Sequence, residues 1–426
     1  MPGEIHVLVL IHGMWGNPLQ LAELARIARE THAEDSSDGT RLHVLVAESI
    51  SGQCTYDGID WGGERVAEEI QGAVKALEHD GDRVTRFSAT GFSLGGLIAR
   101  YCITVLNQQG FFETIEPVNF TAIATPHCGV PRYNSLISSL TSTLGPKLLS
   151  RTGEQMYCVD KWSPTGRSLL VVMADPDREF YKTLAKFQHI KIYANAVNDK
   201  TVPYVTAAIE ISDPFVDHET NGIQIEFHEM YERVISHFAV PSSRTPDTLK
   251  PAVTSAAWFK GSKASKPFLP PFLQFRFPLN ILFYLLLPIL IPLFIIFLIV
   301  MLSLASRSSR ARIKELEREA TGRSQQTLFK LLGKLENEIA DATAGLVDDP
   351  DALLLQAPTS KAHPIISVTH SRIARWLNTL PIKKERAFFG EEFNSHAIIV
   401  SRDIQTIENH REGECVIRHW AESLVV

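Results

Sequence analysis

Residues 84–96 read VTRFSATGFSLGG, in which an apolar strand pattern runs into a turn and then into a helical pattern. Gly91, Ser93 and Gly95 fit G-x-S-x-G, in which a serine occupies a tight turn between a strand and a helix. Side chains in place of Gly91 or Gly95 would collide with the strand or the helix. Because the turn would present the Ser93 hydroxyl at the carboxyl end of a sheet, we predict Ser93 as a nucleophile. An ordinary structural turn is the alternative.

The sequence on both sides of this turn predicts a parallel α/β sheet. Residues 1 to about 240 alternate short apolar runs, typical of buried strands, with amphipathic stretches, typical of helices. Strands are expected at residues 5–11, 42–47, 84–90, 120–124 and 190–196, and helices at 18–31, 62–79 and 94–107. Residues 129–187 mix Gly, Pro, Ser and apolar residues between two expected strands, so we expect a cap or lid there.

Three short motifs give the sequence a family resemblance: HGMWG at residues 12–16, GFSLGG at 91–96 and ATPH at 124–127. Together they resemble the lipase-type serine esterases of the α/β-hydrolase fold. More narrowly, the sequence resembles the fungal "putative serine esterase" family, which includes lipid-droplet phospholipases and monoacylglycerol-type lipases. The resemblance covers residues 1–210 and the tail after residue 365, where NSHAIIV at 394–400 is similar to that family's histidine motif. It implies an α/β-hydrolase fold with a mostly parallel central sheet.

The resemblance also assigns the loop after the first expected strand. In α/β-hydrolases, a backbone N–H of this loop and the N–H of the residue after the nucleophile form the oxyanion hole. These positions correspond to Met14 and Leu94. His12 and Gly13 are expected to be structural, with the His12 side chain holding the loop by hydrogen bonds.

The catalytic acid should follow the nucleophile along the chain, at the end of a later strand. Asp199 stands just after the expected strand 190–196, in the sequence NDKTVP, and similar lipases place their acid in such a D-x-x-V-P turn. Asp199 is therefore the predicted acid, with an ordinary turn residue as the alternative. Asp175 and Asp177 are weaker rivals inside the expected cap.

The catalytic base must be a histidine that follows Asp199. His396 is favoured because it lies in the family-like motif at 394–400. His228 and His237 follow Asp199 at a more usual distance and are the alternatives. The other histidines of this part of the chain are His218, His363, His370, His410 and His419.

An uncharged, strongly apolar segment interrupts the chain late. No charged residue occurs between Phe277 and Ser306, and residues 279–304 form a run of 26 that are mostly Leu, Ile, Phe and Val. At about 1.5 Å per residue, a helix of this length exceeds the roughly 30 Å hydrocarbon core of a bilayer. Pro288 and Pro292 inside it, with basic residues on both flanks, favour a kinked hairpin whose ends share one face. A simple span and a buried core helix are the alternatives.

The order of the candidate site residues supports the hairpin. Ser93 and Asp199 precede the apolar segment and His396 follows it, yet the members of a triad must be in hydrogen-bond contact. We therefore expect five parts: a catalytic body over 1–240, a linker over 241–266, a membrane hairpin over 267–306, a charged helical insert over 307–362, and a C-terminal completion of the hydrolase over 363–426.

Composition excludes several other classes of protein. The 426 residues are 45% hydrophobic and carry a formal net charge of −6, which indicates neither a disordered chain nor a nucleic-acid-binding protein. The five cysteines, at 54, 102, 128, 158 and 415, have no C-x-x-C spacing, so we expect neither a disulfide framework nor a zinc site. The His and Asp residues have no ligand-like spacing, so we expect no metal, and we expect no cofactor. The N-terminus does not resemble a signal peptide, and the sequon at Asn119 falls in an expected core strand, so glycosylation is not expected.

The resemblance and the apolar segment together suggest a membrane- or lipid-droplet-associated serine hydrolase that cleaves acyl esters of glycerolipids. We expect it to lie on a lipid droplet or the endoplasmic reticulum with its catalytic body facing the cytosol. The cytosol is reducing, which fits the unpaired cysteines. The alternatives are a deacylase or acyltransferase on another membrane acyl ester, and a non-catalytic membrane-anchored interaction protein. Protein partners, and the choice between phospholipids and acylglycerols, stay open.

Overall fold

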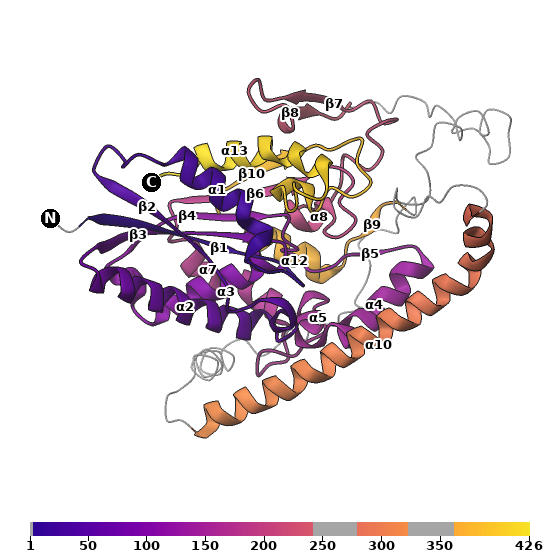
Figure 1. Cartoon of the computed structure of the whole chain (residues 1–426), viewed down its shortest axis with the longest axis horizontal. Coiled ribbons are helices and arrows are strands. Elements are labelled where there is room, and N and C mark those ends of the chain that lie inside the picture. The colour runs from indigo at the N-terminus through magenta and orange to yellow at the C-terminus, as the bar shows by residue number, and fades with distance from the viewer. Residues whose placement is uncertain (1–2, 242–278, 323–361) are drawn as a thin grey trace.

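The computed structural model describes residues 3–241, 279–322 and 362–426 (Figure 1). In these residues, eight strands form one sheet in the order β2-β1-β3-β4-β6-β10-β8-β7. The first six in that order are parallel: β2 (Thr40–Val46), β1 (Glu4–Ile11), β3 (Arg83–Phe92), β4 (Glu116–Ile123), β6 (His189–Asn195) and β10 (Ile382–Ala387). β8 (Val234–Ala239) and β7 (Gln224–Phe227) add an antiparallel edge. The expected mostly parallel, α/β-hydrolase-like sheet is confirmed.

The central strand β1 shows why the sheet needs cover on both faces. Val7 and Val9 belong to one hydrophobic core, whereas Leu8 and Leu10 belong to the other. Successive side chains of a strand point to opposite faces, so a strand that is apolar at every position must be buried on both.

Helices cover both faces (Figure 1). Side chains of α1 (Ala22–Thr31) and α13 (Glu414–Glu422) share one core, and those of α2 (Ile59–His79), α3 (Leu94–Gln108) and α12 (Val368–Leu377) share the other. Short helices occupy the connections: η1 (Pro18–Leu21), η2 (Gly52–Tyr56), η3 (Phe111–Glu113), α8 (Tyr204–Ala207), η5 (Ile398–Val400) and η6 (Glu408–Gly413). Because β10, α12 and α13 come from the C-terminal residues, these residues complete the body that the N-terminal residues begin.

The region expected to be a cap, residues 129–187, divides into two parts. β5 (Arg132–Tyr133), which pairs with β9 (Pro364–Ile365), is followed by α4 (Leu136–Leu148) and α5 (Ser150–Met156). The second half contains α6 (Leu169–Ala174) and α7 (Glu179–Leu184), whose apolar side chains lie in the same core as α3. α6 and α7 are therefore part of the main core and Met156 of α5 packs against it, whereas no residue of α4 belongs to it.

The apolar segment forms one helix, α10 (Leu279–Gly322), in place of the expected kinked hairpin. Pro288 and Pro292 lie inside this helix. Each proline removes one backbone hydrogen bond, whereas a turn within the apolar run would leave several backbone groups without partners. Among the described residues, this is one helix long and apolar enough to cross a membrane, over Phe283–Arg318.

α10 continues through the expected boundary between residues 306 and 307 to Gly322. The helix thus joins the apolar run to the first charged residues of the expected insert. The remaining parts of the expected linker, hairpin and insert, at residues 242–278 and 323–361, lie outside the described residues.

Candidate active site

Ser93 lies between β3 and α3 in a strained backbone conformation, with φ 55° and ψ −125°. The turn is tight: a Cβ at Gly95 would lie 2.1 Å from the carbonyl oxygen of Ile11, and one at Gly91 would lie 2.4 Å from that of Gly95. The Ser93 N–H donates to the Ile123 carbonyl at 2.8 Å, which fixes the turn against β4. The Ser93 hydroxyl is therefore held at the carboxyl edge of the parallel strands.

His396 bridges Ser93 and Asp199. Its Nε2 lies 3.0 Å from Ser93 Oγ, and its Nδ1 lies 2.9 Å from Asp199 Oδ2. A proton on Nδ1 would be donated to the carboxylate, which leaves Nε2 to accept the proton of the serine hydroxyl. The side chains of Ser93 and His396 are buried, so this line of contacts is largely shielded from water.

The carboxylate of Asp199 accepts hydrogen bonds from three other groups. The N–H groups of Thr201 and Val202 donate to Oδ1 at 3.0 and 2.7 Å, and the Asn195 amide donates to Oδ2 at 2.8 Å. Asn195 is the last residue of β6. These donors fix the orientation of the carboxylate and stabilise its charge.

The loop that carries His396 is fastened to the loop that carries Asp199. The Ser395 N–H donates to the Asn198 carbonyl at 3.0 Å, and the Ser395 hydroxyl donates to the Val197 carbonyl at 2.9 Å. The Phe92 ring lies against the imidazole of His396, with ring centroids 5.0 Å apart. β10 pairs with β6, so the loops that follow these two strands meet at one edge of the sheet.

The loop after β1 lies against Ser93. A Cβ at Gly13 would lie 2.8 Å from Ser93 Cβ, so only glycine allows this approach. His12 is buried, and its Nδ1–H donates to the Gly13 carbonyl at 3.0 Å, as expected of a structural residue. Met14 follows in this loop, and Leu94 is the first residue of α3, where helical N–H groups have no partner within the helix.

Trp15 ties this loop to η2, a support that the sequence did not reveal. The Trp15 N–H donates to Thr55 Oγ1 at 3.2 Å, and its indole N–H donates to the Tyr56 hydroxyl at 2.7 Å. No periodic or motif signal connects positions so far apart in the sequence. The aromatic pair holds the residue next to Met14.

The rival candidates have other contacts. Asp175 pairs with Arg167 at 2.8 Å, and the Asp177 N–H donates to Asp175. His228 packs against the ring of Tyr231, and His237 lies exposed on the edge hairpin of β7 and β8. Of the histidines considered for the base, the structure brings His396 into contact with Ser93 and Asp199.

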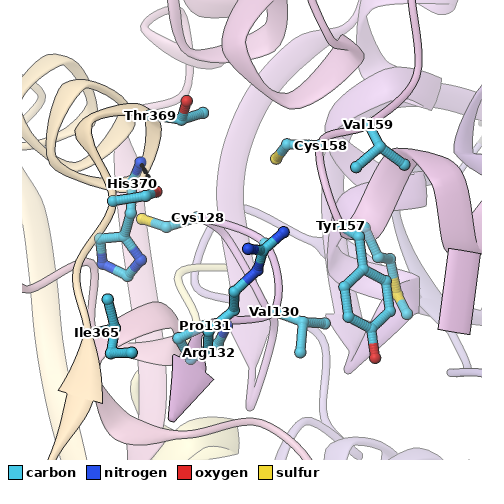
Figure 2. A pocket seen from close by; sticks show the side chains of 13 residues that line it. Cys128, Val130, Pro131, Arg132, Tyr157, Cys158, Val159, Ile365, Thr369 and His370 are labelled. Carbon is cyan, nitrogen blue, oxygen red and sulfur yellow. Dashed lines mark hydrogen bonds between the residues drawn. The ribbon is translucent and has the colours of Figure 1, made fainter. Parts of the chain in front are cut away.

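A cavity of about 110 Å³ lies elsewhere in the body (Figure 2). Residues 128–132, 156–159 and 365–370 contribute its lining, which includes no member of the Ser93–His396–Asp199 group. His127, just before this lining, is 3% exposed, and burial lowers its pKa well below the usual value. It is therefore neutral, and the geometry gives it no contact with the nucleophile.

The described residues contain no group of three or more His, Cys, Asp or Glu side chains that could hold a metal ion. The chemistry available at this site is that of a serine, an imidazole, a carboxylate and backbone N–H groups. Such a set can carry out acyl transfer through a nucleophilic serine.

The fold and this site define an α/β-hydrolase-type protein with a candidate serine nucleophile. Residues 2–212 match the family described as "Putative serine esterase (DUF676)". Through these residues, about half of the chain, the protein belongs to that family.

Two curated relatives are similar to the same part of the chain. The "Putative lipase C4A8.10" of Schizosaccharomyces pombe is 29% identical over 222 residues, which are 51% of this chain and 28% of that protein. The "Putative lipase ROG1" of Saccharomyces cerevisiae is 26% identical over 211 residues, which are 49% of this chain and 29% of that protein. The match thus spans less than a third of the length of either relative. Among solved structures, carboxyl esterase 2 of Tuber melanosporum is 16% identical, with a TM-score of 0.30, over 45% of this chain and 57% of that chain.

Proposed function

We propose that this protein is a lipid-surface serine hydrolase that cleaves acyl esters of glycerolipids with Ser93, His396 and Asp199. The observation that carries the proposal is the contact of His396 with both Ser93 Oγ and Asp199 Oδ2, at 3.0 and 2.9 Å. These three side chains come from loops after three different strands of one sheet. They have the geometry of a nucleophile, a base and an orienting acid.

The reaction begins when His396 Nε2 takes the Ser93 proton as Oγ attacks the ester carbonyl carbon. Asp199 holds the imidazole in the required tautomer and stabilises the imidazolium. The tetrahedral intermediate collapses, the C–O bond to the alcohol breaks, and His396 returns the proton to the leaving oxygen. Water, deprotonated by His396, then attacks the acyl-enzyme, which releases the fatty acid and restores Ser93.

The oxyanion of each tetrahedral intermediate accepts hydrogen bonds from the N–H groups of Met14 and Leu94. The position of Leu94 at the start of α3 adds the positive end of a helix dipole. The close approach of Gly13 to Ser93 brings the Met14 loop beside the nucleophile. Preorganised donors of this kind commonly lower the barrier by about 3 kcal/mol each.

The exposed apolar side chains of α10 support a lipid surface as the site of action. Large side chains from Ile281 to Leu304 lie open to solvent in the absence of a membrane. The chain before α10 supplies Ser93 and Asp199, and the chain after it supplies His396, so both flanks of α10 serve one catalytic body. We propose that this body lies on the cytosolic face of a lipid droplet or of the endoplasmic reticulum, where acyl esters are concentrated.

Lipid hydrolysis by the purified full chain tests this function. Wild type, incubated with vesicles that contain mixed phospholipids and acylglycerols, should release fatty acid. Ser93→Ala and His396→Ala should each lose about 10³-fold or more of the turnover. His228→Ala is the matched control and should retain turnover near wild type. Equal loss in the His228 and His396 variants, or full turnover by Ser93→Ala, would overturn the assignment. Acyl transfer to an added alcohol, without fatty acid release, would favour an acyltransferase.

A further inference from the structure

Helix α4 exposes a cluster of aliphatic side chains on one face. Leu136, Ile137 and Leu140 are 90%, 77% and 58% exposed. At 100° per residue these three positions span about a quarter of the helix circumference. No charged residue occurs from Tyr133 to Pro146. Single exposed aliphatic residues are common on soluble proteins, but a contiguous cluster on an uncharged helix marks an interaction surface.

Most hydroxyls of α4 donate hydrogen bonds to carbonyl oxygens of the preceding turn. Four hydroxyls donate to carbonyl oxygens three or four residues earlier, at 2.8–3.1 Å: Ser139, Thr141, Ser142 and Thr143. A helix in water has no need of such bonds, because water satisfies exposed hydroxyls. In a lipid environment every donor requires a partner in the protein. Such bonds also form in helices that face water, so this pattern permits lipid surroundings and the aliphatic cluster carries the inference.

Helix α4 lies beside α10 (Figure 1). The Ser306 hydroxyl donates to the Lys147 carbonyl at 3.0 Å, and further along both chains the hydroxyls of Ser150 and Ser309 lie 3.2 Å apart. The two segments therefore run in the same direction. The turns of α4 before Lys147 lie alongside the part of α10 before Ser306, which is its apolar run.

We propose that α4 is a second membrane-contacting element, whose Leu136–Ile137–Leu140 face enters the same lipid surface as α10. This inference rests on the proposed membrane association of α10. The occupant is a lipid surface because the cluster is continuous with the apolar run of α10 and carries no charge. With two contacts, the body is fixed in orientation and cannot rotate about a single helix.

A photoreactive lipid tests the inference on the unmodified full chain. The protein is bound to phosphatidylcholine vesicles that contain an ether-linked phosphatidylcholine with a diazirine in its alkyl chain. An esterase cannot cleave the ether bond. After irradiation, tryptic peptides are mapped by mass spectrometry. Arg132 and Lys147 bracket α4, so a single peptide, residues 133–147, reports on it. The control is peptide 403–411, which carries the exposed Ile407 and no residue of the proposed catalytic group.

We expect peptide 133–147 to be labelled at least about fivefold more than peptide 403–411. Labelling of the α10 peptide, 277–307, without labelling of 133–147 would overturn the inference and leave the membrane association of α10 standing. A second copy of the chain on this face would give that result, because it would shield α4 from lipid. Labelling of neither peptide would overturn both the inference and the proposed membrane association.

A variant gives a functional readout. Leu136→Ser/Ile137→Ser/Leu140→Ser should lower turnover of vesicle lipids about tenfold and leave hydrolysis of a water-soluble short-chain ester within twofold of wild type. The soluble ester verifies that the variant is folded and that the active site is intact. Equal turnover of vesicle lipids by variant and wild type would overturn the inference. If the variant does not fold, the labelling of the wild-type peptides decides the question.

Discussion

Ser93 adopts φ 55°, a conformation that side chains other than glycine rarely take, and its neighbours hold it there. Such a position costs on the order of 1–3 kcal/mol, which the surrounding structure must offset. Gly95 contributes by allowing α3 to start almost in contact with the Ile11 carbonyl. The conformation of the nucleophile thus depends on residues that have no chemical role.

Replacing Gly95 by alanine should therefore unfold or severely destabilise the protein. The new Cβ would lie 2.1 Å from the Ile11 carbonyl oxygen, a backbone atom that cannot move freely. We expect a loss of about 3 kcal/mol or more in the free energy of unfolding, seen as a large fall in Tm. Gly72→Ala is the matched control, because nothing lies within 4 Å of its Cβ position in α2. It should stabilise the protein by up to about 1 kcal/mol, and equal melting of the two variants would contradict the packing argument.

Glu64 is a second residue in unfavourable surroundings, here for the ionised form of its carboxyl group. Burial, with Asp60 and Glu68 nearby, raises its pKa to about 8 from 4.5. Below about pH 4.5 both the folded and the unfolded chain keep the proton, so nothing is lost. As pH rises toward 8, the unfolded chain releases this proton while the folded chain retains it, so the stability of the folded state falls.

Glu64→Gln should remove this pH-dependent loss. Its Tm should exceed that of wild type at pH 8.5, by an amount that corresponds to about 1–3 kcal/mol, and the difference should shrink toward pH 5. Melting curves of the detergent-solubilised protein at both pH values measure this. The exposed Glu78 on the same helix supplies the control, and Glu78→Gln should leave the pH dependence unchanged. A constant Tm difference at all pH values would argue against a buried, protonated Glu64.

At the scale of elements, α10 has contacts with η2, the short helix next to the loop after β1. Arg312 donates to both carboxylate oxygens of Asp57, at 2.8 and 3.2 Å, and to the Gln53 carbonyl at 2.9 Å. The Asp57 side chain is fully buried and also pairs with Arg65. Gln53 belongs to η2, the same short helix whose Thr55 and Tyr56 hold Trp15 beside the Met14 loop.

Arg312→Ala should therefore weaken both stability and catalysis. A buried carboxylate that loses one of two cationic partners should cost about 1–3 kcal/mol in the free energy of unfolding. The kcat for a soluble ester should fall severalfold, because η2 loses a contact that positions the oxyanion loop. Arg318→Ala is the control, since Arg318 is exposed and pairs with Glu315 on its own helix. Equal kcat values for the two variants would show that α10 does not support the loop.

The elements also show how far the sequence could predict the structure. β1 was predicted because it is mostly apolar, and β3 because it leads into the G-x-S-x-G turn. β10 was not, because its sequence IKKERA is mostly charged and only its place between β6 and β8 makes it a strand. The prolines in α10 suggested a hairpin, but the helix continues through them. A sequence alone does not reveal whether a helix turns at a proline or tolerates the missing hydrogen bond.

At the scale of the whole molecule, the two described parts that flank α10 form one body. β10, from residues after α10, lies in the sheet between β6 and β8, which come before it. Ser93, Asp199 and His396 were predicted because motif and chain order are local signals. The contacts that fasten their loops, from Ser395 to Asn198 and to Val197, join residues that only the folded sheet brings together, so the sequence contained no sign of them.

The central claim is that Ser93 is an activated nucleophile, and labelling with a fluorophosphonate tests it most directly. The reagent bonds to a serine whose proton a neighbouring base removes, so it reports on Ser93 and His396 without any assumption about the lipid substrate. We predict that wild type is labelled, with the adduct mapped by mass spectrometry to Ser93, and that Ser93→Ala and His396→Ala are not. Absence of labelling in wild type, or equal labelling of Ser93→Ala, would contradict the account.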